Sequence, residues 1–304
     1  MRTILITFGG REVSLKTLFN YIIKYKDYID EYHLYIATKN KKDIAFMENF
    51  AQEHDFVKTV YTYKDGKITY DMCYVWDNAY NNCQEEDVVY IKLDDDIVYF
   101  NEDLFTKFVP FRIKNKEVPC LYPVIINNTV ISGKLEELGI INYSKKTNLL
   151  KNWKNVFSPH FENIRKNPGA VPPLQNLVGE QNLLCPIAWG DIDYCINLHN
   201  QFTNDVANNN ISKYKIETWK LENCEPVSIA CMSWLGSSLK RYLETYGKIS
   251  RDEQWWAVYL PTWSDNRNVV FGDCVVSHYA YYVQRDKGLD NTDILEKYHK
   301  ISLQ

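Results

Sequence analysis

The amino-acid sequence predicts an α/β fold built on a mostly parallel central sheet flanked by helices. Two observations support this fold class. In the first hundred residues, short apolar runs alternate with segments whose apolar residues recur at helical spacing, and turn residues close the apolar runs. This order of elements favours parallel strands joined by right-handed crossovers. Ligands of such sheets bind beyond the carboxyl ends of the strands, so residues that follow a strand are the first candidates for a site.

Local patterns define the individual elements. Runs rich in Val, Ile, Tyr and Thr predict strands at residues 3–8, 32–38, 57–63 and 87–93. Amphipathic segments predict helices at residues 15–23, 44–54 and 70–81. After residue 100 the alternation is less regular, and we expect long loops over 142–186 and a polar turn over 204–212. Near the C-terminus we expect a helix that Ser250 and Glu253 begin as a capping box, strands at 269–272 and 274–282, and a helix at 291–298.

The length and charge of the chain limit the classes of function. Its 304 residues show no internal repeat and no linker, which predicts one continuous domain. The 35 basic and 39 acidic residues give a net charge of -4, which argues against broad binding to nucleic acid or to an anionic membrane. No run approaches the roughly 18 to 20 apolar residues of a membrane span, and no secretory leader precedes the first strand. We therefore expect a cytoplasmic protein with reduced cysteines.

Aromatic residues are unusually frequent. The chain has 23 Tyr, 8 Trp and 13 Phe, and aromatic faces suit the C–H faces of sugar rings as well as nucleobases. Trp234, which precedes Leu235-Gly236-Ser237, is a candidate stacking platform for an acceptor sugar, although for any single Trp a position in the core is the favoured interpretation. The aromatic content also leaves open a non-catalytic carbohydrate-binding protein, although such a protein needs no cluster of carboxylates.

Three consecutive carboxylates, Asp94, Asp95 and Asp96, follow the predicted strand at 87–93. Like charges this close raise one another's pKa, and a divalent cation relieves the conflict. Hard oxygen ligands suit Mg²⁺ or Mn²⁺. The alternation of side chains along an extended chain predicts Asp94 and Asp96 on one face and Asp95 on the other. An acidic turn that caps a following helix is the structural alternative, but the β-rich residues 97–100 disfavour a helix there.

The segments around these carboxylates resemble the nucleotide-sugar-dependent glycosyltransferases of the GT-A fold. The stretch at 90–98, YIKLDDDIV, is similar to a strand of a bacterial, fungal and large-DNA-virus group that includes the capsid-glycan transferases of chloroviruses. The opening TFGGR at 7–11 looks like the first nucleotide-binding turn of that group. Residues 252–253, 268–273 and 276–280 look like its C-terminal half. The resemblance spans residues 3–298 and implies a nucleotide-sugar-binding half at 1–100 and an acceptor-binding half at 101–304.

The resemblance also implies roles for individual residues. Asp96 is expected to bind the metal, with Asp94 assisting and His278 completing the metal shell, while Asp95 or Asp94 bonds the ribose. Arg285, with Gln284 beside it, is expected to meet the diphosphate. The nucleotide pocket is expected to be lined by Thr7, Phe8, Gly9 and Arg11.

An inverting enzyme of this group needs a general base for the acceptor hydroxyl, usually a carboxylate at a helix N-terminus. Asp252 fits that position. The order here is Asp-Glu where the common pattern is Glu-Asp, so Glu253 remains a rival. Both carboxylates also fit an ordinary helix N-terminus, where negative charge complements the macrodipole.

The sequence thus predicts a metal-dependent, inverting glycosyltransferase. Its donor is expected to be a UDP-sugar, with xylose favoured, its metal Mn²⁺ or Mg²⁺, and its acceptor an oligosaccharide or glycoprotein. A nucleotidyltransferase that makes NDP-sugars is the catalytic alternative, because it also holds Mg²⁺ by carboxylates after a strand. It normally needs a Gly-rich, basic phosphate loop, of which Gly9-Gly10-Arg11 is a poor version.

Overall fold

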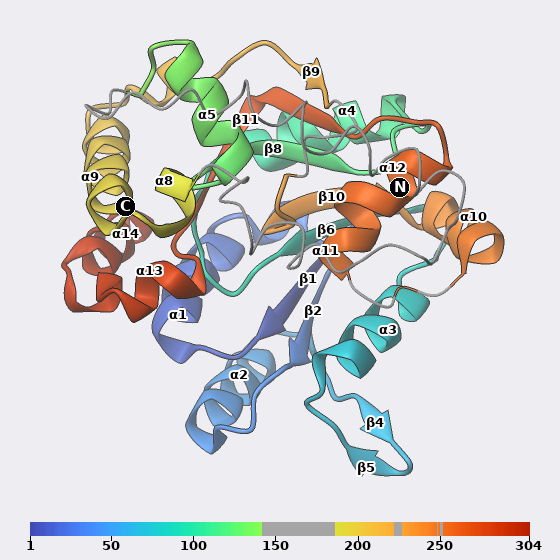
Figure 1. Ribbon diagram of the computed structural model, residues 1–304. Helices are drawn as coiled ribbons and strands as arrows, with labels where there is room; N and C mark the ends of the chain where they lie inside the picture. Colours follow the sequence, from blue (N-terminus) through green and yellow to red (C-terminus); the bar gives the residue numbers. More distant parts are fainter. Residues whose placement is uncertain (142–185, 222–226, 248, 250–251) are drawn as a thin grey trace.

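The computed structural model describes residues 1–141, 186–221, 227–247, 249 and 252–304. Within these ranges one large sheet runs through the molecule with helices on both sides, so the predicted α/β class is confirmed (Figure 1). The predicted loops at 142–185 and the predicted helix-capping Ser250 lie outside the described residues. No helix in the described ranges is long and apolar enough to cross a membrane.

The sheet order is β3-β2-β1-β6-β10-β8-β11-β7, with β9 paired to β11. Parallel pairing joins β3 to β2, β2 to β1, β1 to β6 and β8 to β11. Strand β10 is antiparallel to both β6 and β8, and β7 is antiparallel to β11. The carboxyl ends of β1, β6, β8 and β11 therefore meet at one edge. The strands are β1 (Arg2–Gly9), β2 (Glu31–Ile36), β3 (Val57–Val60), β6 (Val88–Leu93), β7 (Ile97–Phe100), β8 (Leu121–Ile126), β9 (Trp219–Lys220), β10 (Cys231–Leu235) and β11 (Val269–His278).

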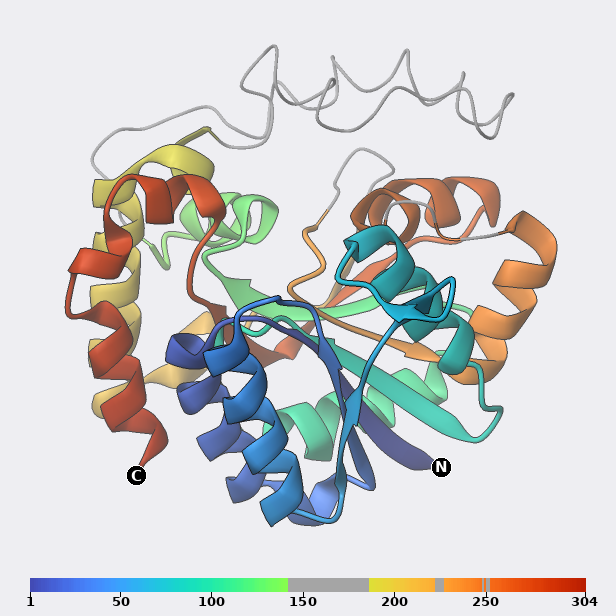
Figure 2. The same cartoon turned by 90° about the horizontal axis from the view of Figure 1, so that it is seen from below.

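Helices cover the sheet in two groups. Figure 2 shows the blue, yellow and red helices on one side and the teal α3 and orange α10 on the other. On the first side α1 packs on β7 and on α14, and α14 packs on α9; on the second, α10 packs on β10 and β6. The helices are α1 (Glu12–Lys24), α2 (Lys41–Glu53), α3 (Met72–Asn82), α4 (Val109–Lys114), α5 (Thr129–Glu137), α8 (Pro186–Gly190), α9 (Ile192–Ala207), α10 (Gly236–Tyr246), α11 (Asp252–Gln254), α12 (Leu260–Trp263), α13 (Tyr282–Asp286) and α14 (Ile294–Ser302).

Three predicted strands have different bounds in the structure. The strand predicted at 57–63 ends at Val60, and a separate hairpin of β4 (Tyr63–Lys64) and β5 (Lys67–Ile68) follows. Asp65 and Gly66 both have positive φ, the conformation that a two-residue hairpin turn requires. The strands predicted at 269–272 and 274–282 form one continuous strand, β11, which ends at His278. Its irregularity lies at Gly272, where a Cβ would stand 1.6 Å from the Ile216 carbonyl oxygen, so only glycine admits the neighbouring backbone.

Helix α9 continues four residues into the predicted polar turn at 204–212, because it buries Thr203 and Asp205 in its last turns. The predicted C-terminal helix is present as α14. The core is continuous through both sides of the sheet. The carboxyl ends of β1, β6, β8 and β11 therefore extend from one tightly packed core.

Candidate metal centre

The turn between β6 and β7 presents the three consecutive aspartates at the carboxyl edge of the sheet. The Asp94 amide donates to the Ala230 carbonyl, and the Ile97 amide donates back to the Asp94 carbonyl, which closes the turn. The Asp94 side chain is about one third exposed, while Asp95 and Asp96 are buried. The structural alternative of an acidic turn before a helix is therefore wrong, because β7 follows directly and pairs with β11.

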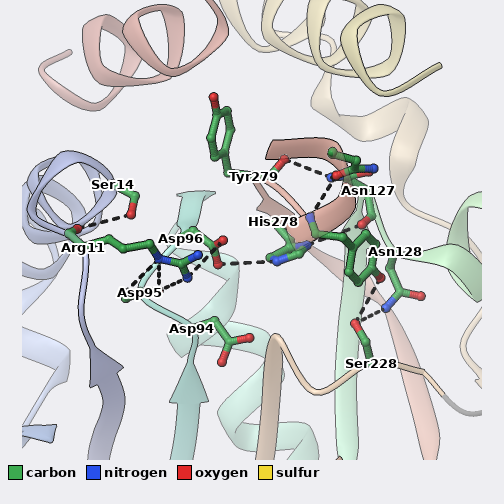
Figure 3. Close-up of polar contacts among 12 residues, drawn as sticks. Arg11, Ser14, Asp94, Asp95, Asp96, Asn127, Asn128, Ser228, His278 and Tyr279 are labelled. Carbon is green, nitrogen blue, oxygen red and sulfur yellow. Dashed lines mark hydrogen bonds and ion pairs between the residues drawn. The ribbon is translucent and has the colours of Figure 1, made fainter. Parts of the chain in front are cut away.

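Asp95 ties this turn to the end of β1. Its carboxylate accepts the Gly10 amide at 2.9 Å and the Arg11 guanidinium at Nε (3.0 Å) and at Nη2. The Arg11 Nη2 also lies 3.2 Å from Asp96 Oδ2. Figure 3 shows Asp95 turned toward Arg11 and away from His278, so the predicted division of faces is present.

Asp96 has three basic neighbours: two guanidiniums and one imidazole. Its Oδ2 accepts from Arg285 Nη2 at 3.0 Å and lies beside Arg11, and its Oδ1 lies 3.4 Å from His278 Nε2. Burial disfavours the charged carboxylate, but the charges of His278, Arg11 and Arg285 outweigh it and hold the pKa of Asp96 well below its usual value. Burial also disfavours protonated His278, yet Asp96 raises the pKa of that imidazole above its usual value.

Asp94, Asp96 and His278 form a cluster that could hold a metal ion. One ligand atom from each residue lies within 4.8 Å of the others. The buried Asp96 Oδ1 accepts no hydrogen bond among the described residues, and His278 Nε2 faces it at 3.4 Å. An unpartnered buried carboxylate oxygen facing an imidazole nitrogen fits a divalent cation. Two carboxylates and one imidazole are compatible with Mn²⁺ and less typical of Mg²⁺.

Lys92 is a member of the site that sequence reasoning missed. Its side chain is 3% exposed, and its ammonium donates to Asp94 Oδ1 and, at 2.9 Å, to the Ile229 carbonyl. Its sequence signal was a lone lysine inside the otherwise apolar run VVYIKL, since a charged group in a fully buried strand requires partners.

The structure separates the two rival base residues in helix α11. Asp252 is buried; its Oδ1 accepts the Glu253 amide at 2.8 Å and its Oδ2 lies 3.4 Å from the Tyr80 hydroxyl. Glu253 is exposed. Burial raises the pKa of Asp252 to about 6, and Lys92 partly opposes it. Desolvation and the charge of Asp252 also raise the pKa of Glu253, to about 7.

Both carboxylates of α11 lie within electrostatic reach of the metal cluster. Lys92 and Asp94 act on the pKa of each, and His278 acts on that of Glu253. The structure thus brings α11 to the same edge of the sheet as the end of β6.

The residues expected to line a nucleotide pocket lie at the end of β1. Thr7, Phe8 and Gly9 are buried, and the Phe8 ring packs on Tyr35 and Tyr80. Arg11 is the one of this group with substantial exposure, with 41% of its side chain accessible. The nucleotide-binding role of this group stays a prediction.

Trp234 takes the core position rather than the stacking role, because it is fully buried in β10 and stacks on Tyr90. One further expectation is wrong. Gln284 is not free to meet a diphosphate, because it is buried and both ends of its amide are bonded within the protein. In both cases an apolar or amide side chain near a motif serves the packing around the site.

No protein-family model matches this chain, and no curated protein matches it. Among solved structures, 4-diphosphocytidyl-2C-methyl-D-erythritol synthase from Anaerococcus prevotii DSM 20548 is 18% identical over 41% of this chain, with a TM-score of 0.30. The match covers 56% of that chain, so this protein spans about half of its length. A likeness this low carries no argument about function.

Proposed function

We propose that this protein is a metal-dependent glycosyltransferase that moves a sugar from a nucleotide sugar to an acceptor hydroxyl. The observation that carries the proposal is the convergence of Asp94, Asp96 and His278 within 4.8 Å at the carboxyl edge of the sheet. A divalent cation held there would neutralise a diphosphate and stabilise it as a leaving group.

The cationic neighbours of Asp96 support a diphosphate ligand. Arg11 comes from the end of β1 and Arg285 from α13, and both guanidiniums meet at Asp96 Oδ2. Planar guanidiniums suit phosphate oxygens. Arg11, the more exposed of the two, is proposed to bind the diphosphate or the base of the donor.

Glu253 is proposed as the general base. Its exposed carboxylate can reach an acceptor, while Asp252 beside it is buried and already bonded by the Glu253 amide. In the transfer, the acceptor O–H proton passes to Glu253, the acceptor oxygen bonds to C1 of the sugar, and the bond from C1 to the phosphate oxygen breaks. The pair of electrons leaves with the nucleoside diphosphate. Attack opposite the leaving group inverts the anomeric centre.

The finer assignments follow the resemblance. The donor is proposed to be a UDP-sugar, with UDP-xylose first in the order of testing, the cation Mn²⁺, and the acceptor a glycan or glycoprotein hydroxyl. Nucleotidyl transfer is the second candidate, because the same carboxylate cluster could bind the metal ion that accompanies a nucleoside triphosphate substrate. The two reactions release different products, UDP in the first and pyrophosphate in the second.

A product assay tests the proposal. The protein is incubated with Mn²⁺ and each of UDP-xylose, UDP-glucose, UDP-galactose and GDP-mannose, with a mixture of free sugars as acceptors, and nucleoside diphosphate release is measured. A parallel reaction with UTP and sugar 1-phosphates measures pyrophosphate. We expect diphosphate release from one donor, reduced by at least about 100-fold in Asp96→Asn and retained in Asp205→Asn. Asp205 is a matched buried carboxylate, but it accepts from Tyr214 and pairs with Lys213, away from the cluster. Pyrophosphate release alone would contradict glycosyl transfer.

A further inference from the structure

The orientation of His278 depends on its second ring nitrogen. The residue ends strand β11, and its Nε2 faces Asp96 at 3.4 Å. Its Nδ1 lies 3.5 Å from the backbone carbonyl oxygen of Asn127. A carbonyl can only accept, so this contact requires the proton on Nδ1 and leaves Nε2 as the nitrogen directed at the carboxylate cluster. This contact is at the long end of hydrogen-bond distances, so a small shift of the Asn127 carbonyl would break it and free the imidazole ring to turn.

Asn127 is held in an uncommon backbone conformation at the end of β8. Its φ is 62°, in the left-handed region that a non-glycine residue seldom adopts and that Asn tolerates best. The side chain is fully buried, and its Nδ2 donates to the Tyr279 carbonyl at 2.9 Å and to Gln284 Oε1 at 3.0 Å. Gln284 Nε2 donates back to Asn127 Oδ1 at 3.0 Å. The two amides thus form a closed, reciprocal pair (Figure 3 shows the Asn127 side of it).

Gln284 anchors this amide pair to two other segments. Its Nε2 also donates to the Ala188 carbonyl at 2.8 Å, and its Oε1 accepts the Tyr281 amide at 2.9 Å. All four N–H donors of the two side-chain amides are therefore bonded inside the protein, and both amide oxygens accept there. Buried amides whose bonds are all made inside the protein are rigid, because any movement leaves a buried polar group unpaired.

The Tyr279 peptide connects the pair to the metal cluster. The Tyr279 carbonyl accepts from Asn127 Nδ2 and from His199 Nε2 at 2.8 Å, while the Tyr279 amide donates to the Asp96 carbonyl at 2.9 Å. Tyr279 follows His278 directly. The backbone of Tyr279 is therefore bonded to Asn127, to His199 and to the backbone of Asp96. His278, which carries the proposed ligand nitrogen, directly precedes it in the chain.

We propose that Asn127, paired with Gln284, is a positioning residue that fixes His278 with its Nε2 directed at the metal site and so sets the affinity of that site. This rests on the proposed function only in that the cluster binds a divalent cation. Asn127 itself touches neither the cation nor a substrate. It acts through the imidazole and the Tyr279 peptide, as groups that bond the second nitrogen of a ligating histidine do in metal sites.

The test is a calorimetric titration of the full chain with Mn²⁺ alone. Asn127→Gly keeps the left-handed backbone and the carbonyl acceptor but removes the amide, since glycine adopts positive φ without strain. We expect the Mn²⁺ affinity to fall by about 10- to 100-fold. Gln284→Met, which removes the other half of the pair, should give a loss of similar size. The double variant should lose little more than either single one, because the two amides act as a unit.

Asn268→Gly is the matched control. Asn268 is equally buried and equally bonded, donating to the Trp256 carbonyl at 2.8 Å and accepting the Cys120 amide at 3.1 Å, but it does not contact the cluster. It should lower the melting temperature as Asn127→Gly does and leave Mn²⁺ affinity within twofold of wild type. Co²⁺ gives a second measurement: its visible absorption reports nitrogen ligation, and the spectrum of Asn127→Gly should move toward that of His278→Ala.

The outcomes separate the two proposals. Wild-type affinity and a wild-type Co²⁺ spectrum in both Asn127→Gly and Gln284→Met, with binding lost in Asp96→Asn, would overturn the positioning role and leave the metal site standing. Equal losses in Asn127→Gly and Asn268→Gly would also overturn it, because the effect would then be one of general stability. Absence of Mn²⁺ and Co²⁺ binding in wild type would contradict the metal site and with it the positioning role. If Asn127→Gly does not fold, Gln284→Met decides alone.

Discussion

Two groups of adjacent acidic residues face the same edge of the sheet, and their surroundings differ. The aspartates after β6 have cationic partners: Asp95 is bonded by Arg11, and Asp96 by Arg11 and Arg285, with His278 close to it. The pair in α11, Asp252 and Glu253, has the ammonium of Lys92 within electrostatic reach, and that ammonium is bonded to Asp94.

This difference shifts the pKa values of Asp96 and of the α11 carboxylates in opposite directions. The pKa of Asp96 is held well below its usual value by its cations, while desolvation and the charge of Asp252 raise the pKa of Glu253, the proposed base, to about 7. A carboxylate that stays ionised at any physiological pH suits a metal ligand, and one whose pKa is raised toward neutrality suits proton transfer. Carboxylates at one edge of the sheet thus suit two different roles because of the charges placed around them.

The largest effect is expected for Glu253→Gln. If Glu253 takes the acceptor proton, kcat should fall by about 10²- to 10⁴-fold, the usual contribution of a general base. Mn²⁺ affinity should stay unchanged, because the residue is not a ligand. In the wild type, kcat should rise with pH along a limb whose apparent pKa lies above the usual 4.5 of a glutamate. A steady-state pH profile checks this, and the same limb persisting in Glu253→Gln would remove the residue from the role.

The next effect is expected for Asp96→Asn. The amide keeps the size of the carboxylate but removes the charge that a cation needs, so activity at saturating donor should fall by about 10²- to 10³-fold. Titration with Mn²⁺ should show the binding loss directly. Asp205→Asn, the buried control, should match wild type; an Asp96→Asn enzyme that still binds Mn²⁺ would show that the carboxylate does not ligate the ion.

Asp252→Asn should stabilise the protein at pH 8. The folded-state pKa of about 6 lies above the usual 3.8, so ionising this carboxyl destabilises the folded state. This destabilisation is absent below about pH 4, grows between pH 4 and pH 6, and is complete above about pH 6. Removing the charge should raise the free energy of unfolding by about 2 kcal/mol at pH 8 and change it little at pH 4. Urea unfolding at both pH values measures this, and an equal effect at both would mean that Asp252 is not strained by its charge.

The smallest effect is expected for Lys92→Met. The ammonium lowers the pKa of both carboxylates in α11, so its removal should move the acidic limb of the activity profile to higher pH by about one unit. At pH 6 this corresponds to about a tenfold loss that higher pH recovers. A uniform loss at all pH values would instead indicate that Lys92 acts by holding Asp94.

Much of this comparison could be predicted from the sequence. The run that ends in Asp94-Asp95-Asp96 is long, apolar and bounded by charge, so its strand and the position of the carboxylates follow from local pattern. The division of Asp95 from Asp94 and Asp96 was predicted from the alternation of an extended chain, but in the structure it arises in the turn that the Ile97 amide closes on the Asp94 carbonyl. The position of the carboxylates is therefore local, while its geometry is that of a turn.

The remainder depends on tertiary contacts that local pattern does not encode. Burial of Asp252 against Tyr80 and exposure of Glu253 depend on how α11 packs, so the sequence left the two as rivals. The amide pair of Asn127 and Gln284 joins residues 157 positions apart, and no spacing rule predicts it. For Trp234 the sequence left a sugar-stacking role open beside the favoured core position, because an aromatic residue near a glycine turn has the same local pattern in both cases.

The most direct test of the central claim is calorimetry with UDP. The claim is that the turn after β6 holds a divalent cation that binds a nucleoside diphosphate, while α11 supplies only the base. UDP is titrated into wild type, Asp96→Asn and Glu253→Gln, each with and without Mn²⁺. We expect Mn²⁺-dependent binding in wild type, the same affinity in Glu253→Gln and none in Asp96→Asn. Binding of UDP that is independent of Mn²⁺, or that survives in Asp96→Asn, would contradict it.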